Sequence, residues 1–116
     1  MKKQFFEHEE EKQSYNLKSD LYKRFLEYNQ VNPEIYKMFK KFTFEVIKSG
    51  YQNCGSQMII ERLRWESMIV AKNDKFKINN DYAAFYSRRF MMEYPKYNNF
   101  FRIRSSVADE LKLKDL

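Results

Sequence analysis

The chain has 116 residues, of which 43% are hydrophobic and 18% aromatic, so its composition excludes an intrinsically disordered chain and predicts one folded domain with its own core. The formal net charge is +6, and a basic chain favours anionic partners such as nucleic acid. One cysteine excludes an intramolecular disulfide, and no apolar run is long enough for a signal peptide or a membrane span, so we expect a cytoplasmic protein with no membrane partner.

Helices are favoured over strands because the chain has only two Gly and two Pro, whereas an all-β fold needs frequent turns. We expect a mainly α fold, a compact bundle of four or five helices, either alone or with a small two-stranded wing. Residues 1–18 are predicted to form a flexible acidic arm around the run Glu9–Glu11, and residues 19–116 a single helical domain.

The first two predicted helices follow each other closely. One runs from Ser19 or Asp20 to about residue 28, since either residue suits an N-cap and apolar residues then recur at helical spacing. The next begins at Pro33 with Asn32 as its N-cap, because Pro is favoured in the first turn of a helix.

A short loop, 51–55, separates the second helix from the third. Gly50 ends the second helix, as Gly commonly does just past a helix, and Ser56 is the predicted cap of a third helix that continues to about residue 70. Trp65 is expected at the margin of the buried side of this helix, and the buried side itself is expected to consist of Ile59, Ile60, Leu63 and Ile69.

Two helices joined by a tight turn also match a helix-turn-helix, a common DNA-binding unit. In this alternative the third helix enters the major groove of DNA and reads base edges with Gln57, Arg62 and Arg64. The turn is longer than usual, and Glu61 and Glu66 on the same helix would oppose phosphates.

The second half of the chain predicts a fourth helix between two extended segments. Phe76–Ile78 and Phe100–Arg104 alternate apolar with basic residues and could pair as the two-stranded wing. The fourth helix is expected over about 82–94, where Pro95 ends it. Ser106–Asp109 has the spacing of a capping box and predicts a brief terminal helix.

The positive charge is concentrated in one part of the chain. Residues 71–104 carry eight basic and three acidic side chains, a net +5, whereas residues 1–30 carry six of each. Rings interleaved with Arg and Lys suit nucleic acid, because rings stack on bases and cations neutralise phosphates. Helical spacing assigns most of these rings to the core, with a basic fringe around it. The candidate residues for contact with nucleic acid or another partner are Lys75, Lys77, Arg88, Arg89, Lys96, Arg102 and Arg104.

Patterns for catalysis or metal binding are weak. His8 is the only histidine and has no second histidine four positions later, as a zinc-protease helix requires. Cys54 has no neighbouring base in the sequence to lower its pKa, and no glycine-rich phosphate loop is present. We therefore expect no enzyme, no metal and no cofactor.

A longer pattern resembles a known kind of protein. The order F-x-I-N-N-x-Y-x3-Y-x-R-x-F-M over residues 76–91, followed by Pro95 and Phe100–Phe101, is similar to a motif of small phage and prophage proteins. Asn32–Pro33 and Glu61–Glu66 fit the same pattern, so the resemblance covers about residues 32–104. It implies a mobile-element origin, and small phage proteins of this size include DNA-binding regulators and anti-CRISPR inhibitors.

The leading interpretation is a small basic phage-type protein that is not an enzyme and acts by occupying nucleic acid or a ribonucleoprotein. As an anti-CRISPR inhibitor it would block a host CRISPR effector nuclease or its guide RNA. One alternative is the helix-turn-helix DNA-binding regulator. The other is a structural phage protein that binds another protein through its aromatic surface.

Overall fold

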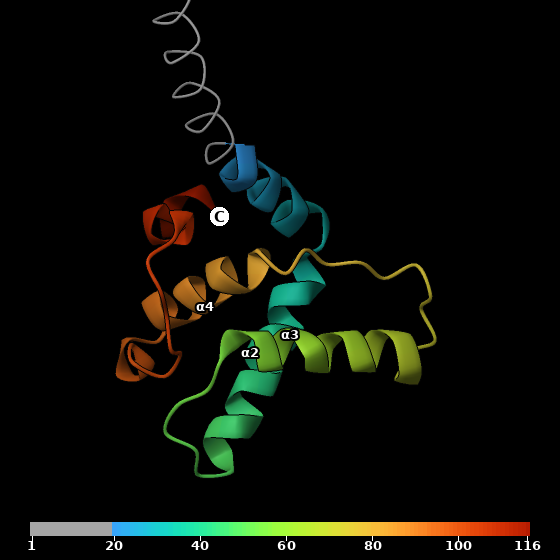
Figure 1. Cartoon of the computed structure of the whole chain (residues 1–116), viewed down its shortest axis with the longest axis horizontal. Helices are drawn as coiled ribbons and strands as arrows, with labels where there is room; N and C mark the ends of the chain where they lie inside the picture. The colour runs from blue at the N-terminus through green and yellow to red at the C-terminus, as the bar shows by residue number, and fades with distance from the viewer. Residues whose placement is uncertain (1–19) are drawn as a thin grey trace, which may run out of the picture.

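Helices form the framework of the protein in the computed structural model, which describes residues 20–116 (Figure 1). Residues 20–31 are helical. The longer elements that follow are α2 (Pro33–Lys48), α3 (Ser56–Trp65), its π-helical continuation η1 (Glu66–Val70) and α4 (Tyr82–Glu93). Three short 3-10 helices complete the chain: η2 (Pro95–Tyr97), η3 (Val107–Glu110) and η4 (Leu113–Asp115). The predicted helical bundle is confirmed, whereas the predicted acidic arm, His8 and the Ser19 cap lie outside the described residues.

The middle of the core is formed by α4. Its Phe85, Tyr86 and Phe90 are fully buried, and both α2 and α3 contact this helix. The helix over 20–31 packs against α4 through Phe25, whose ring stacks on Phe85 with 4.4 Å between the ring centroids. Buried aromatic side chains of this size supply much of the apolar area that stabilises a small domain. The rings of α4 therefore belong to the core, as their helical spacing predicts.

The break between the first two helices is narrower than expected. The helix over 20–31 extends past the predicted end, and the backbone N–H of Asn32 still bonds to the carbonyl oxygen of Tyr28 at 2.9 Å. Pro33 then begins α2 as predicted. Asn32 occupies the N-cap position, but its side-chain amide donates to the oxygen of Tyr28 at 3.1 Å and does not cap α2. The amide bonds to the preceding helix. The predicted N-cap position of α2 is therefore right, but the predicted side-chain capping bond is wrong.

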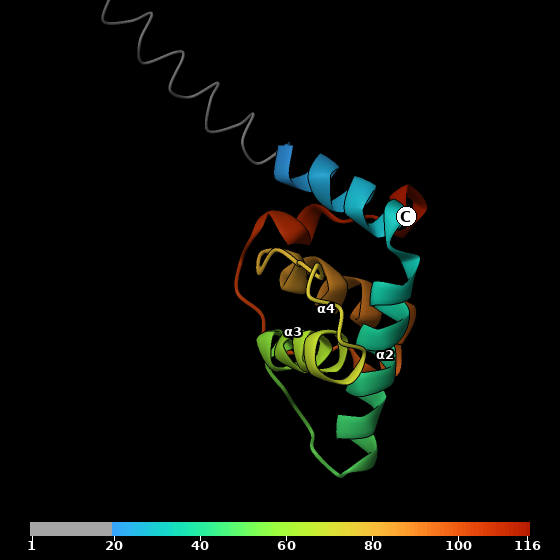
Figure 2. The ribbon, with the colours of Figure 1, turned by 90° about the vertical axis from the view of Figure 1, so that its right-hand side faces the viewer.

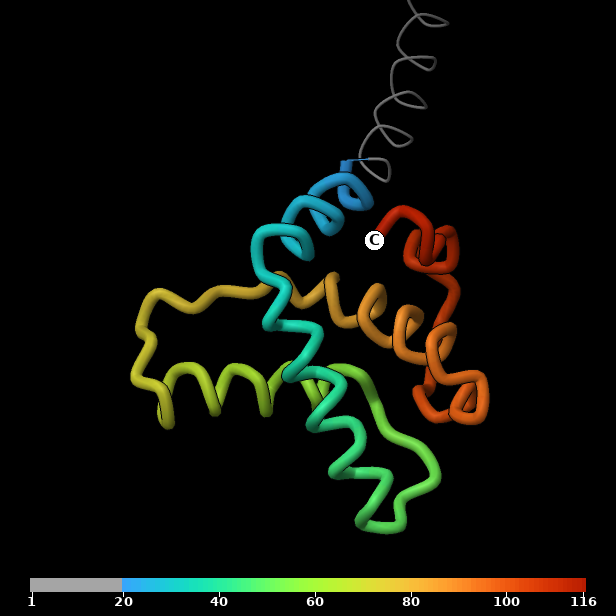
Figure 3. Tube along the Cα trace, turned by 180° about the vertical axis from the view of Figure 1, so that it is seen from behind, coloured from blue at the N-terminus to red at the C-terminus, as the bar shows by residue number. Residues whose placement is uncertain are grey.

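The loop between α2 and α3 turns at a glycine. Gly50 has a φ of 96°, in the left-handed region that glycine adopts without a steric penalty. This confirms Gly50 as the end of α2. The N-cap of α3 is Gly55 and not Ser56, since Ser56 is already the first helical residue. From behind, α2 crosses in front of α3, so α3 has one face against α2 and an opposite face turned outward (Figure 3).

The predicted two-stranded wing is wrong. Phe76–Ile78 and Phe100–Arg104 do not pair with each other, and the described residues contain one isolated bridge, a parallel one between Cys54 and Phe101. The N–H of Cys54 donates to the oxygen of Phe100 at 3.0 Å, and the N–H of Arg102 donates to the oxygen of Cys54 at 3.2 Å. The alternation misled because Ile78, Phe100 and Phe101 are all buried in the core, where each is held by the helices rather than by a partner strand.

The C-terminal segment packs back onto the beginning of the described chain (Figure 2). The capping box at Ser106–Asp109 is present as predicted, although the turn it begins, η3, is a 3-10 helix. The Tyr22 hydroxyl donates to Asp115 Oδ2 at 2.9 Å and accepts from the N–H of Lys112 at 3.2 Å. These contacts join residues about ninety positions apart in the chain, so the two ends of the described chain stabilise each other.

Candidate binding surface

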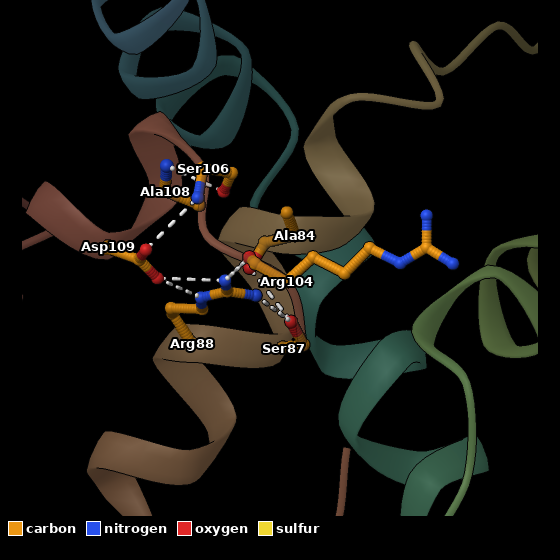
Figure 4. A network of polar contacts seen from close by, with 7 residues as sticks. All are labelled: Ala84, Ser87, Arg88, Arg104, Ser106, Ala108 and Asp109. Carbon is orange, nitrogen blue, oxygen red and sulfur yellow. Dashed lines mark hydrogen bonds and ion pairs between the residues drawn. The ribbon is translucent and has the colours of Figure 1, made fainter. Parts of the chain in front are cut away.

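Arg88 is an internal residue and not part of a surface patch. Its side chain is 9% exposed. Its Nε and Nη2 lie 3.0 and 2.8 Å from Asp109 Oδ1, and Nη2 also donates to the backbone oxygen of Arg104 at 2.7 Å (Figure 4). The backbone N–H of Ser106 and the Arg88 guanidinium hold the pKa of Asp109 below its ordinary value. Arg88 therefore ties the C-terminal segment to α4, which removes it from the predicted contact residues.

Arg89 holds three helices together. Its Nε lies 3.1 Å from Glu93 Oε2, its Nη1 donates to Asn29 Oδ1 at 2.9 Å, and its guanidinium carbon lies 3.9 Å from the centre of the Tyr36 ring. The Tyr36 hydroxyl donates to Glu93 Oε1 at 2.9 Å. Burial and this hydrogen bond to Glu93 raise the pKa of Tyr36 far above its ordinary value. Arg89 is thus partly buried and engaged within the fold.

The remaining predicted cations are exposed, but they lie on two separate segments. One segment, 71–81, is at the right of Figure 1, and the other, 96–104, is at the left. The Arg104 side chain extends away from the Arg88 cluster, to which it gives only its backbone oxygen (Figure 4). In the part of the chain that the structure describes, none of these cations forms an ion pair: Lys75, Lys77, Lys96, Arg102 and Arg104.

Two of the three predicted base-reading residues of α3 bind the loop before α4. Gln57 Nε2 donates to Glu61 Oε1 at 3.1 Å and to Asn80 Oδ1 at 3.0 Å. Arg64 also bonds to both of these acceptors, and its Nη2 donates to the backbone oxygen of Ile78 at 3.0 Å. Base reading in the major groove needs free side chains on an exposed helix face. These contacts direct Gln57 and Arg64 toward the protein's own loop.

Arg62, the third of these residues, lies between α2 and α3. Its Nε is 2.9 Å from Glu66 Oε1, its Nη1 is 3.6 Å from Glu45 Oε2, and its guanidinium carbon is 4.6 Å from the centre of the Phe42 ring. The side chain thus joins the two helices and is balanced by two carboxylates. The observed geometry gives no support to the helix-turn-helix alternative.

Apolar side chains gather on the exposed side of α3 and η1, next to the charged Glu61 and Arg62, a feature that the sequence prediction missed. Trp65 is 59% exposed, and Ile69, predicted to be buried, is 56% exposed. The buried stripe of Ile59, Ile60 and Leu63 is as predicted, but η1 extends beyond the rest of the helices at the right of Figure 1. Residues there have little to pack against. We call the following exposed residues the α3 ridge: Met58, Trp65, Met68, Ile69 and Val70.

One signal in the sequence could have revealed the ridge. Met58, Trp65 and Ile69 are separated by seven and four positions, which places them on one helix face, different from the buried stripe. A helix with two apolar stripes has more apolar surface than one core contact covers. Exposed apolar side chains that gather in this way mark interaction sites more often than isolated ones do.

A pocket of about 620 Å³ lies between the end of α2 and the beginning of α3. We call it the α2–α3 pocket. Burial raises the pKa of the Cys54 thiol in its wall, so this thiol lacks the lowered pKa of a catalytic cysteine. The pocket is lined by Glu45, Val46, Ser49, Tyr51, Asn53, Cys54, Gly55, Met58, Arg62 and Arg102.

No protein-family model matches the chain, and neither a curated protein nor a solved structure matches it. Within residues 20–116, no group of three or more side chains could hold a metal ion, and no helix is long and apolar enough to cross a membrane. The fold and surface define a small helical protein with exposed cations that no described carboxylate pairs with, and with a cluster of exposed apolar residues on its outer helix.

Proposed function

We propose that the protein is a non-enzymatic binding protein directed at nucleic acid within a ribonucleoprotein. The phage-like pattern of residues 76–91 supplies the context for this proposal, in which the protein is an anti-CRISPR inhibitor that occupies a host effector nuclease or its guide RNA. The mechanism is occupancy, with phosphates bound by cations and protein surface bound by the α3 ridge.

The distribution of ion pairs supports an anionic target. Five arginines are paired with carboxylates of the protein itself, whereas Arg102 and Arg104 are exposed and, among the described residues, without a carboxylate partner. The paired arginines are engaged by carboxylates of the protein, whereas the side chains of Arg102 and Arg104 are available to bind a partner. An exposed cation without a partner neutralises a phosphate with little loss of internal bonding, and it releases counterions from the nucleic acid.

The salt dependence of RNA binding tests this proposal. The Arg102→Ala/Arg104→Ala variant should bind single-stranded RNA more weakly and with a flatter salt dependence than the unchanged protein. Each lost phosphate contact reduces the slope of log K against log salt concentration by about 0.7 for single strands. The measurement is a fluorescence-anisotropy titration at several salt concentrations.

The matched control is Lys37→Ala/Lys41→Ala, which removes two exposed cations from α2. Its salt slope should stay close to that of the unchanged protein. Equal slopes for both double variants would show that RNA binding depends only on the total charge of the protein, and would exclude a phosphate contact at residues 102–104. A guide-loaded effector nuclease then tests the anti-CRISPR context, since an inhibitor should reduce its cleavage of target DNA.

A further inference from the structure

The α2–α3 pocket has the size of a small-molecule site. Its volume of about 620 Å³ is within the roughly 300–1,000 Å³ that ligand pockets usually enclose. Three parts of the chain meet there: the last turns of α2, the loop over 51–55 with the first turns of α3, and Arg102, which the bridge between Cys54 and Phe101 brings alongside. A second, smaller hollow of about 210 Å³ shares Glu45, Val46, Met58 and Arg62 with it, so the groove continues between the two helices.

Three ionised side chains line the pocket: Glu45, Arg62 and Arg102. Glu45 and Arg62 line it together, with Arg62 Nη1 3.6 Å from Glu45 Oε2, and Arg62 also binds Glu66 Oε1 at 2.9 Å, so Glu45 is partly compensated. Arg102 is the remaining ionised side chain in the lining, and in the described part of the chain no carboxylate pairs with it. A Cβ built on Gly55 would lie 3.7 Å from Arg102 Nη2, which places the guanidinium beside the start of α3. A ligand in this pocket therefore meets one uncompensated positive charge.

Other residues of the lining suit a flat ring. Tyr51 lines the pocket and is 67% exposed, and no ring of the described residues stacks on it. Val46 and Met58 add apolar surface, and Asn53 places a side-chain amide in the lining. An exposed aromatic ring stacks on nucleobases of any sequence, and an amide side chain can pair with a base edge.

We propose that the α2–α3 pocket holds one nucleotide of a single-stranded nucleic acid, with its base against Tyr51 and its phosphate at Arg102. This inference rests on the proposed function and names where on the protein the strand is recognised. A free nucleotide carries the same base and phosphate, so the experiment compares a strand with a mononucleotide.

Methionine methyl groups report on the pocket directly. In protein labelled with ¹³C at the methionine methyls, titration with a short single-stranded RNA should shift the Met58 signal, because Met58 lines the pocket. Met92 lies on α4, outside the residues that line the pocket, so its signal should stay in place. A 5′-mononucleotide should shift Met58 only at much higher concentration, because it has one of the phosphates that the strand presents.

Four variants assign the contacts. Tyr51→Ala and Arg102→Ala should each weaken the RNA-dependent shift of Met58 by about tenfold in apparent Kd, in the range expected for loss of a stacked base or a phosphate contact. Tyr51→Phe keeps the ring and should bind as the unchanged protein does. Lys37→Ala removes an exposed cation of α2 that does not line the pocket, and it should leave the Met58 shift intact.

The two proposals fail in distinguishable ways. If RNA binds by anisotropy but Met58 does not move, the pocket assignment is wrong and the proposed function stands. If a mononucleotide saturates the Met58 shift as readily as the RNA does, the pocket is a free-nucleotide site and the strand assignment is wrong. If neither measurement detects RNA, both proposals are wrong.

Discussion

Arg88 and Arg102 show how the same side chain acquires different roles. Arg88 is buried, and its guanidinium binds Asp109 and the backbone oxygen of Arg104. Arg102 is exposed at the edge of a pocket. A buried guanidinium must be paired, since an unpaired charge away from water is strongly unfavourable, while an exposed guanidinium is hydrated and available. The degree of burial therefore distinguishes Arg88, which stabilises the fold, from Arg102, which is available to bind a ligand.

Replacing Arg88 with Met should destabilise the fold. Arg88→Met keeps the length of the apolar stem but leaves the oxygen of Arg104 without its donor and Asp109 with only the backbone N–H of Ser106. Loss of a buried charged hydrogen bond costs about 2 kcal/mol in the free energy of unfolding. Urea denaturation measures the change. Arg104→Met, at an exposed position, is the control and should change this free energy by less than about 0.5 kcal/mol; equal effects of the two variants would contradict the assignment.

At the scale of elements, the α3–η1 helix ends with a strained residue. Lys72 has a φ of 53°, in the left-handed region that residues with a Cβ rarely adopt. The N–H of Ala71 closes the last π turn on the oxygen of Glu66 at 2.9 Å, and the N–H of Asn73 donates to the oxygen of Ser67 at 2.8 Å, so hydrogen bonds fix the backbone on both sides of Lys72. Glycine is the usual residue at such a helix end, so the stop signal that marks Gly50 in the sequence is missing here.

Lys72→Gly should stabilise the protein by about 0.5–1 kcal/mol, because glycine adopts this backbone conformation without the steric penalty. The measurement is the midpoint of thermal or urea unfolding. Lys75→Gly is the matched control, since Lys75 is not among the described residues with positive φ. It should leave stability unchanged or lower it through the greater flexibility of the unfolded chain. A stabilisation of the same size in both variants would point to loss of charge and not to relief of strain.

At the scale of the whole molecule, the ridge and the exposed cations lie on the outer sides of elements whose inner sides form the core. The buried stripe of α3 attaches this helix to α2 and α4, which leaves the α3 ridge on the outside. Trp is among the residues that contribute most to protein interfaces. The ribonucleoprotein target proposed above contains both protein and nucleic acid. Its protein part would contact the α3 ridge, and its phosphates would contact the exposed cations.

Trp65→Glu should abolish capture of a protein partner while leaving the fold stable, because Trp65 is exposed and contributes little to the core. The measurement is an affinity pull-down from defence-positive host cells with and without nuclease, together with circular dichroism of each variant. Val31→Glu is the matched control, since Val31 is 77% exposed but lies outside the ridge. Retained capture by Trp65→Glu would exclude the ridge as the contact surface.

By itself, the sequence determined the helical class, the start of α2 at Pro33, its end at Gly50 and the capping box of η3. Each depends on residues a few positions apart, so local periodicity and backbone preferences suffice. Only the tertiary structure decided that Arg88 is internal and Ile69 exposed. The partner of Arg88 lies 21 positions away along the chain, and the exposure of Ile69 depends on where the neighbouring helices end. Long-range packing decides which cations and apolar residues remain at the surface; the local spacing of Met58, Trp65 and Ile69 shows a second apolar stripe but does not show which stripe the core covers.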